Sequence, residues 1–265
     1  MTRYDLLTNW IARLLGDKLL IEPASSDASF RRYFRVRKKG QSYIVMDAPP
    51  DKEDISSFVV IGKQLLKDNI KVPDFFDINS PDGFILMSDF GSITYRDALN
   101  LHGPAYLYGS ALNSLLGMQK NCHYQNIPTY SAALLVGEMA LFKEWYLSKH
   151  KKTILNDKEN RSLEEIIQLI VSSNLDQPQS FVHRDFHSRN LMFIDRNTGP
   201  GIIDFQDAVN GPITYDLVSL LKDAYYELEE DMVIDLLVRH WEKLKEANLI
   251  KSNDFSDFYK IFEWM

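Results

Sequence analysis

Two stretches of the chain carry most of its information: residues 181–192 read Phe181-Val182-His183-Arg184-Asp185-Phe186-His187-Ser188-Arg189-Asn190-Leu191-Met192, and residues 202–207 read Ile202-Ile203-Asp204-Phe205-Gln206-Asp207. In each stretch a short apolar run leads into a polar segment that contains a carboxylate. Asn197-Thr198-Gly199-Pro200 is a strong turn signal between them. The pattern predicts a strand that enters a polar loop, a hairpin, and a second carboxylate at the end of the next strand.

The order of three polar side chains in these stretches predicts phosphoryl transfer. An alcohol that attacks the γ-phosphate of ATP needs a carboxylate on a rigid loop to orient it and to accept its proton, and Asp185 fits this role of catalytic base. Mg²⁺ prefers oxygen ligands and keeps several waters. Asn190 and Asp204 would supply an amide oxygen and a carboxylate oxygen to magnesium that bridges the phosphates. A lone Asp or Asn in a loop is usually a turn residue, but the ordered set is hard to explain in that way.

The elements around these stretches favour two lobes. Apolar patterning predicts an N-terminal helix, strands over 19–21, 33–36, 43–46, 75–78 and 84–87, and a helix from about 51 to 67. Beyond Gly91, helical patterns cover 104–120, 131–149, 158–173, 214–226 and 229–247. We therefore predict an α+β, two-lobed fold of the protein-kinase type. A small antiparallel-sheet N-lobe (1–88) would bind nucleotide, and a larger, mainly helical C-lobe (89–265) would carry catalysis and substrate binding.

The catalytic-loop pattern resembles a known group of kinases. The H-x-D-F-H-x-x-N string at 183–190 and the I-I-D-F-x-D-A string at 202–208 resemble the aminoglycoside-phosphotransferase and choline-kinase superfamily, whose members have a protein-kinase-like fold. His187 favours this group over true protein kinases. Residues 26–35, 45–50 and 204–217 are similar to bacterial sugar kinases of cell-wall recycling. This resemblance implies ATP and Mg²⁺ as cofactors and the anomeric hydroxyl of N-acetylmuramate or N-acetylglucosamine as acceptor. An aminoglycoside or choline-type kinase is the alternative.

The kinase-like arrangement also suggests where nucleotide binds. The candidates are two serines of a small-residue loop, two arginines beside that loop, and the connector between the lobes: Ser26, Ser29, Arg31, Arg32, Met87, Asp89 and Phe90. Small residues let the backbone approach phosphate closely, and the connector would offer backbone groups to adenine. The simpler interpretations are an ordinary turn, two solvated charges on an edge strand, and a helix N-cap at Ser88 or Asp89.

One departure from related kinases concerns the third strand. Residues 43–47 read Tyr-Ile-Val-Met-Asp and contain no lysine to hold the α- and β-phosphates. Either Arg31 or Arg32 replaces that lysine, or the chain is an inactive pseudokinase that acts as a nucleotide-binding scaffold. The intact Asp185, Asn190 and Asp204 favour the first interpretation.

Several other polar and aromatic residues are secondary candidates. Asp207 would face the substrate, whereas Asp216 would brace the catalytic loop by accepting its backbone N–H groups, and His183 would orient the loop. Four aromatic residues on C-lobe helices are candidates for stacking on a sugar but are as easily explained as core: Trp145, Tyr146, Tyr225 and Tyr226.

A different chemistry is open to the H-x-D-x-H string. His183, Asp185 and His187 would suit zinc or manganese in a hydrolase, but such a site needs a further ligand cluster. The sequence has only six His, and this interpretation leaves Asn190 and Asp204 without a role.

Composition narrows the class of protein. The chain has 265 residues and a formal net charge of -7, which argues against a broad basic surface for nucleic acid or anionic membrane. It has one cysteine, no signal-peptide pattern and no run of about 20 apolar residues. We expect a cytoplasmic monomer whose partner is a small molecule, without nucleic acid or membrane.

The apolar spacing of 255–265 predicts a helix without a stop signal, so a truncated C-terminus is also expected.

Overall fold

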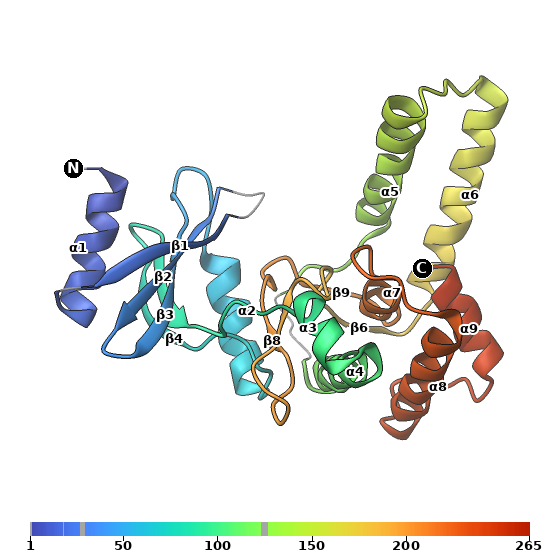
Figure 1. Cartoon of the computed structure of the whole chain (residues 1–265). Coiled ribbons are helices and arrows are strands. Elements are labelled where there is room, and N and C mark those ends of the chain that lie inside the picture. The colour runs from blue at the N-terminus through green and yellow to red at the C-terminus, as the bar shows by residue number, and fades with distance from the viewer. Residues whose placement is uncertain (1, 18, 27–29, 123–126) are drawn as a thin grey trace. The chain divides into compact units, whose positions relative to one another are not determined.

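The computed structural model describes residues 2–17, 19–26, 30–122 and 127–265 (Figure 1). They form two compact units, Met1–Ile93 with Met192–Gln206, and Thr94–Leu191 with Asp207–Met265. The first unit therefore includes the hairpin that follows the catalytic loop, which differs in extent from the predicted N-lobe. The assignment of nucleotide binding to 1–88 and of catalysis to 89–265 stays a prediction.

The first unit is built on a five-stranded antiparallel sheet. Its strands are β1 (Leu20–Ser26), β2 (Arg32–Lys38), β3 (Gln41–Asp47), β4 (Phe75–Asn79) and β5 (Phe84–Ser88), in the order β1-β2-β3-β5-β4. Lys39 and Gly40 join β2 to β3 with φ angles of 49° and 83°. Two left-handed residues give the two-residue hairpin turn whose twist matches that of the strands. The five predicted strands and this turn are confirmed.

Helix α1 (Arg3–Leu15) covers one face of the sheet. Leu7, Trp10 and Ile11 on the helix form a buried cluster with residues of β2, β3 and β5. On β5 the cluster takes Phe84 and Leu86, whereas Ile85 and Met87 alternate to the other face, as the period of a strand requires. The sheet therefore has one face packed on α1 and a second apolar face.

Helix α2 (Ser56–Lys67) begins later than the predicted start near residue 51. The backbone N–H groups of Lys52 and Glu53 both donate to the carbonyl of Pro49, so this segment is a turn and not a helix. Asp54 then accepts the N–H of Ser56 at 2.9 Å. The acidic residues of this stretch therefore precede the helix instead of forming its first turn.

The substitution Gly62→Ala on α2 is expected to destabilise the protein. A Cβ at this position would lie 2.5 Å from the ring of Phe75 and 2.9 Å from that of Phe205. Overpacking of this kind costs about 1–3 kcal/mol of stability. Gly109→Ala on helix α4 (Pro104–Asn121) is the matched control, because nothing lies within 4 Å of its added Cβ. This substitution should be stabilising by up to about 1 kcal/mol. Urea unfolding measures the midpoints of the two variants and of the wild type. A Gly62→Ala midpoint equal to that of Gly109→Ala would show that α2 accommodates the methyl group.

The second unit is mainly helical. Its helices are α3 (Tyr95–His102), α4 (Pro104–Asn121), α5 (Ala132–Leu141), the π-helix η1 (Phe142–His150), α6 (Asp157–Leu175), α7 (Tyr215–Leu221), α8 (Glu230–Glu246) and α9 (Phe255–Glu263). Strands β6 (Gln179–Val182) and β9 (Val209–Pro212) pair antiparallel within it. The short hairpin strands β7 (Leu191–Met192) and β8 (Gly201–Ile202) pair next to the division between the units. Helices α5 and α6 lie side by side as a two-helix hairpin (Figure 1).

Two predicted helices of this unit need correction, and two of its elements were not predicted. Helix α3 and strand β9 were not predicted, and the single helix expected over 131–149 is divided into α5 and η1. The helix expected over 214–226 ends at Leu221, so Tyr225 and Tyr226 lie beyond it. Within the described ranges, none of the helices combines the length and the apolar character of a membrane span.

Candidate active site

The catalytic loop follows β6 and is braced by a buried carboxylate. Asp216, in the first turn of α7, accepts the backbone N–H of His183 at 2.7 Å with one oxygen and that of Arg184 at 3.0 Å with the other. Asp216 is almost fully buried. The predicted bracing role of Asp216 is therefore confirmed.

Inside the loop, backbone contacts fix the residue that carries the proposed base. The N–H of Asp185 lies 3.3 Å from Nδ1 of His183, and its carbonyl accepts the N–H of His187 at 3.0 Å. The side-chain Nδ2 of Asn190 donates to the same carbonyl at 3.1 Å. Asp185 is exposed, whereas His183 is buried. The loop thus holds the exposed residue Asp185 on a backbone that is tied down on both sides.

A second buried carboxylate, Asp223, braces the other end of the loop. It accepts the backbone N–H of Ser188 at 2.9 Å and the hydroxyl of Tyr108 at 3.2 Å. Burial, followed by the charge of Asp223, raises the pKa of Tyr108, so this hydroxyl stays a donor. Asp223 was not predicted as a brace, because it lies inside the helix expected over 214–226, where a charged residue usually faces solvent.

The substitution Asp216→Asn tests the first brace. An amide has one acceptor oxygen, so its NH₂ group would face one of the two backbone N–H donors. We expect kcat to fall about 10- to 100-fold, because a small displacement of a catalytic loop has effects of that size. Asp235→Asn on α8 is the control, because its exposed carboxylate pairs with Arg239 within the same helix. Wild-type kcat in the Asp216 variant would contradict the bracing role.

Asp216 also predicts a pH dependence of stability. Burial raises its pKa to about 7, from an ordinary value of 3.8, although its two N–H hydrogen bonds act in the opposite direction. Between these pH values the folded chain holds a proton that the unfolded chain has released. The free energy of unfolding of the wild type should therefore fall relative to that of the Asp216→Asn variant as pH rises toward 7, by at most roughly 1.4 kcal/mol per unit. Urea titrations from about pH 5 to pH 8 measure the difference, and a constant difference would exclude Asp216 as the titrating group.

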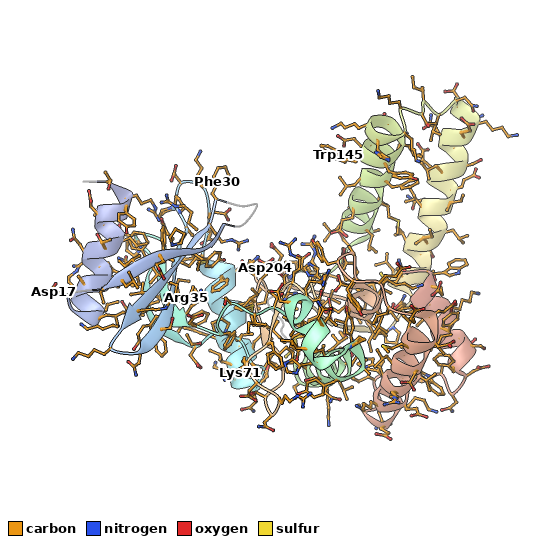
Figure 2. All side chains as sticks on the ribbon, viewed as in Figure 1. Asp17, Phe30, Arg35, Lys71, Trp145 and Asp204 are labelled. Atoms are coloured by element: carbon orange, nitrogen blue, oxygen red, sulfur yellow. The ribbon has the colours of Figure 1, made fainter. Side chains whose placement is uncertain are left out.

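The second carboxylate of the motif, Asp204, lies in the first unit, two residues after the end of β8. Its φ angle is 66°, in the left-handed region. Its Oδ1 accepts the side-chain amide of Gln206 at 3.0 Å and lies 3.8 Å from Nη2 of Arg31. The next residue, Phe205, is buried and stacks on Phe58 at 4.7 Å, which anchors the segment (Asp204 is labelled in Figure 2).

The two arginines beside the predicted phosphate loop have different partners. Arg31 is largely buried near Asp204, whereas the guanidinium of Arg32 lies 2.5 Å from Asp47. Asp47, at the end of β3, is almost fully buried and also binds Arg3 of α1 at 2.6 Å. The interpretation of Arg31 and Arg32 as two merely solvated charges is wrong, and of the pair only Arg31 is placed beside a carboxylate of the motif. Ser29 and the side chain of Ser26 lie outside the described part of the chain.

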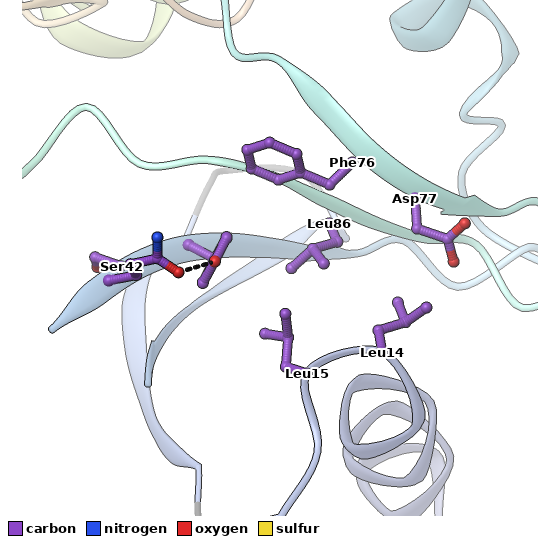
Figure 3. A pocket seen from close by; sticks show the side chains of 8 residues that line it. Leu14, Leu15, Ser42, Phe76, Asp77 and Leu86 are labelled. Carbon is purple, nitrogen blue, oxygen red and sulfur yellow. Dashed lines mark hydrogen bonds between the residues drawn. The ribbon is translucent and has the colours of Figure 1, made fainter. Parts of the chain in front are cut away.

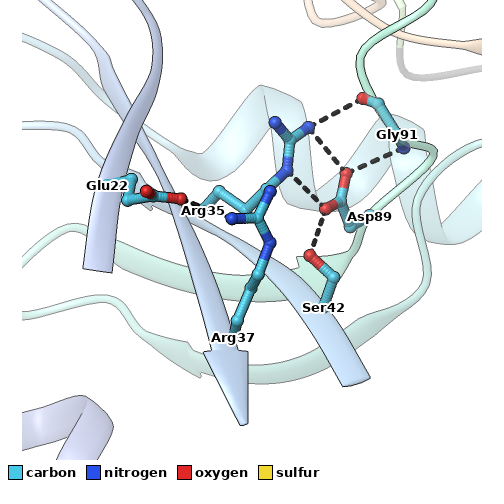
Figure 4. A network of polar contacts seen from close by, with 6 residues as sticks. All are labelled: Glu22, Arg35, Arg37, Ser42, Asp89 and Gly91. Carbon is cyan, nitrogen blue, oxygen red and sulfur yellow. Dashed lines mark hydrogen bonds and ion pairs between the residues drawn. The ribbon is translucent and has the colours of Figure 1, made fainter. Parts of the chain in front are cut away.

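The connector after β5 is fixed by a buried ion pair (Figure 4). Arg35 of β2 binds both oxygens of Asp89, at 2.6 and 3.0 Å, and also donates to the carbonyl of Gly91 at 2.8 Å. Ser42 and the N–H of Gly91 donate to the same carboxylate. Burial alone would raise the pKa of Asp89, but the hydrogen bonds from Arg35, Ser42 and Gly91 and the charge of Arg35 outweigh it. The net pKa lies below the ordinary value, so Asp89 is ionised.

This connector is not the start of a helix. Helix α3 begins at Tyr95 and has Thr94 as its N-cap, so the predicted alternative of a cap at Ser88 or Asp89 is wrong. Phe90 packs against Gly201, where a Cβ would lie 2.4 Å from its ring. Met87 is buried in β5 opposite Ile44. The side chain of Asp89 thus serves the connector itself, and only backbone groups remain to be considered for a nucleotide.

A cavity of about 570 Å³ lies elsewhere in the first unit (Figure 3). Its lining residues come from the end of α1, from β3, β4 and β5: Leu14, Leu15, Gln41, Ser42, Tyr43, Phe76, Asp77 and Leu86. Leu86 and Leu15 also belong to the cluster that joins α1 to the sheet. The cavity is therefore on the α1 face, and none of the predicted nucleotide-binding residues lines it.

Three further candidates from the sequence have exposed side chains. Asp207 is exposed in the turn before β9, and the side chains of Trp145 and Tyr146 are 56% and 45% exposed on η1, so they are not core residues. The hydrolase alternative required further ligands beside His183, Asp185 and His187. Across the described ranges, no three His, Cys, Asp or Glu side chains are grouped so as to hold a metal ion.

Comparison with solved structures shows the fold. An ADP-bound aminoglycoside phosphotransferase, APH(2'')-Ib, superposes with a TM-score of 0.61 at 19% identity and covers 92% of this chain and 83% of its own. An ethanolamine kinase from Plasmodium vivax gives a TM-score of 0.64 at 12% identity over 93% of this chain and 75% of its own. The predicted two-lobed, protein-kinase-like α+β fold is confirmed.

Comparison with curated sequences shows the family. N-acetylmuramate/N-acetylglucosamine kinases from Pseudomonas aeruginosa and Neisseria meningitidis are 38% and 37% identical to the chain, over 99% and 100% of its length and 80% of their own. The model of the phosphotransferase enzyme family matches residues 20–249. The chain thus belongs to the phosphotransferase enzyme family and is an ATP-dependent kinase.

Proposed function

We propose that the chain transfers the γ-phosphate of ATP to the anomeric hydroxyl of N-acetylmuramate or N-acetylglucosamine. The observation that carries this proposal is the identity of 35–38% with three curated kinases named for these two sugars, over nearly the whole chain. The proposal extends to a cytoplasmic location and a monomeric state, which are predictions from composition.

Asp185 is the proposed catalytic base. Its carboxylate is exposed, on a loop whose backbone is held by Asp216 and Asn190. A carboxylate fixed in this way can orient the sugar hydroxyl and accept its proton as the bond to phosphorus forms. Asp207 is the proposed contact to the sugar, because its exposed carboxylate follows the motif closely.

Asn190 and Asp204 are the proposed magnesium ligands, and their chemistry suits that ion. Mg²⁺ binds through one or two protein oxygens together with waters and phosphates, so a compact set of His and carboxylates is not required. In Asn190 the amide nitrogen points to the carbonyl of Asp185, so its oxygen lies on the other branch of the amide. When bound, the ion would neutralise charge on the β- and γ-phosphates.

Nucleotide binding is assigned to the first unit. We propose that backbone groups of Met87, Asp89 and Phe90 contact adenine, that Ser26 and Ser29 cover the phosphates, and that Arg31 or Arg32 supplies the missing cation. Arg31 is the better candidate, since Arg32 and Arg3 both bind the buried Asp47.

A coupled assay of ADP release tests the function. The panel is N-acetylmuramate, N-acetylglucosamine, kanamycin and choline, with ATP and Mg²⁺, and with the Asp185→Asn variant as the blank. Turnover on the N-acetyl sugars alone supports the proposal. Turnover only on kanamycin or choline would keep the chemistry and overturn the substrate. ATP binding without turnover on any acceptor would favour a pseudokinase.

A further inference from the structure

Arg184, directly before Asp185, has a backbone conformation that arginine rarely adopts. Its φ angle is 78°, in the left-handed region. Such a conformation persists only where surrounding contacts hold it, and it is concentrated at functional sites. The backbone N–H of Arg184 is held by Asp216 at 3.0 Å. Its side chain is held separately, by a residue far away in the sequence.

That residue is Glu138 on α5. Its Oε1 lies 2.5 Å from Nη2 of Arg184, and its Oε2 accepts hydrogen bonds from the hydroxyls of Tyr130 and Tyr215. Burial raises the pKa of both phenols, that of Tyr215 to about 12, so both stay protonated and donate. Glu138 is thus fixed by two phenols as well as by Arg184, and it can hold the guanidinium in one place.

The pair is poorly suited to a purely stabilising role. The side chains of Arg184 and Glu138 are 26% and 30% exposed, and partly exposed ion pairs contribute little to stability. Its position, however, is next to the proposed base. A rotation of the backbone at Arg184 would swing the carboxylate of Asp185, and displacements of about 1 Å at a reacting group lower rates strongly.

We propose that Glu138 is a positioning residue for Asp185, acting through Arg184. The inference rests on the proposed role of Asp185 as the base. It assigns to α5 a part in catalysis, because α5 supplies the carboxylate that holds the side chain of Arg184, the residue of the loop with a left-handed backbone. Residue 138 lies in a helix with no motif around it, so the sequence pattern did not indicate it.

The experiment compares Glu138→Gln with wild type on the N-acetyl sugar that turns over. We expect kcat to fall about tenfold or more, while KM for ATP stays within about twofold. Asp235→Asn is the matched control: it breaks an Asp–Arg pair on the exposed surface of α8 and should leave kcat unchanged. Arg184→Lys keeps the positive charge, so its kcat should lie between that of the wild type and that of Arg184→Met.

The decisive variant combines Glu138→Gln with Asp185→Asn. If Glu138 acts through the base, the double variant is no slower than Asp185→Asn alone. Losses that multiply would overturn the inference, and so would wild-type kcat in Glu138→Gln beside a slow Asp185→Asn. Wild-type turnover in Asp185→Asn would instead overturn the proposed base. If Glu138→Gln does not fold, as the loss of a cooperative urea transition would show, the kcat values of the two Arg184 variants are compared in the same way, alone and combined with Asp185→Asn.

Discussion

Replacing Asp185 by asparagine is expected to lower kcat by about 10²- to 10⁴-fold, the range for removal of a general base. An amide of the same size keeps the shape of the side chain but cannot accept the proton of the sugar hydroxyl. The N–H and the carbonyl of residue 185 make contacts within the loop, and asparagine keeps both of these backbone groups. ATP binding should therefore stay close to that of the wild type.

Steady-state kinetics and titration of ATP measure the two effects separately. Asp231→Asn is the matched control, because it removes an exposed carboxylate from the first turn of α8 in the same unit. A variant at position 185 that turns over like the wild type would remove Asp185 from its role. Loss of ATP binding together with turnover would mean that the residue acts on the fold of the loop and not on the proton.

The parts of the fold that were predicted are those with a short-range sequence pattern, either apolar periodicity or characteristic turn residues. The strands of the sheet follow apolar alternation, and the β2–β3 turn follows from Lys39-Gly40, where φ is positive at both residues. Helix α3 has only eight residues, and β9 contains glycine and proline, so neither has enough periodicity to be recognised. Their formation depends on neighbours: β9 pairs with β6 over its four residues.

The same limit applies to the candidate site. Asp216 was predicted as a brace because it lies within a recognisable motif, although its partners are more than thirty positions away. Glu138 and Arg35 were missed, because a charged residue on a helix or strand usually faces solvent and has no sequence signal for a distant partner. Glu138 reaches a residue 46 positions on, and Arg35 one 54 positions on. Only the fold brings these charges to the catalytic loop and the connector.

Replacing Asp204 by alanine is expected to abolish magnesium-dependent turnover, because the proposed role of Asp204 is to supply an anionic oxygen to the ion that holds the phosphates. A readout independent of turnover is the affinity for ATP with and without Mg²⁺. In the wild type, Mg²⁺ should strengthen ATP binding, and in the variant this difference should largely disappear.

The left-handed backbone of Asp204 requires a second variant, because alanine is strained at a φ of 66°. Asp204→Asn is the matched control: asparagine adopts positive φ more readily than most residues and keeps the size of the side chain, but it lacks the charge. If both variants lose the magnesium dependence of ATP binding, the carboxylate is the metal ligand. If Asp204→Asn behaves like the wild type and only Asp204→Ala fails, the negative charge of Asp204 is not required for metal binding. The residue would then act through the backbone turn that presents Phe205 to Phe58, or through a neutral oxygen as proposed for Asn190.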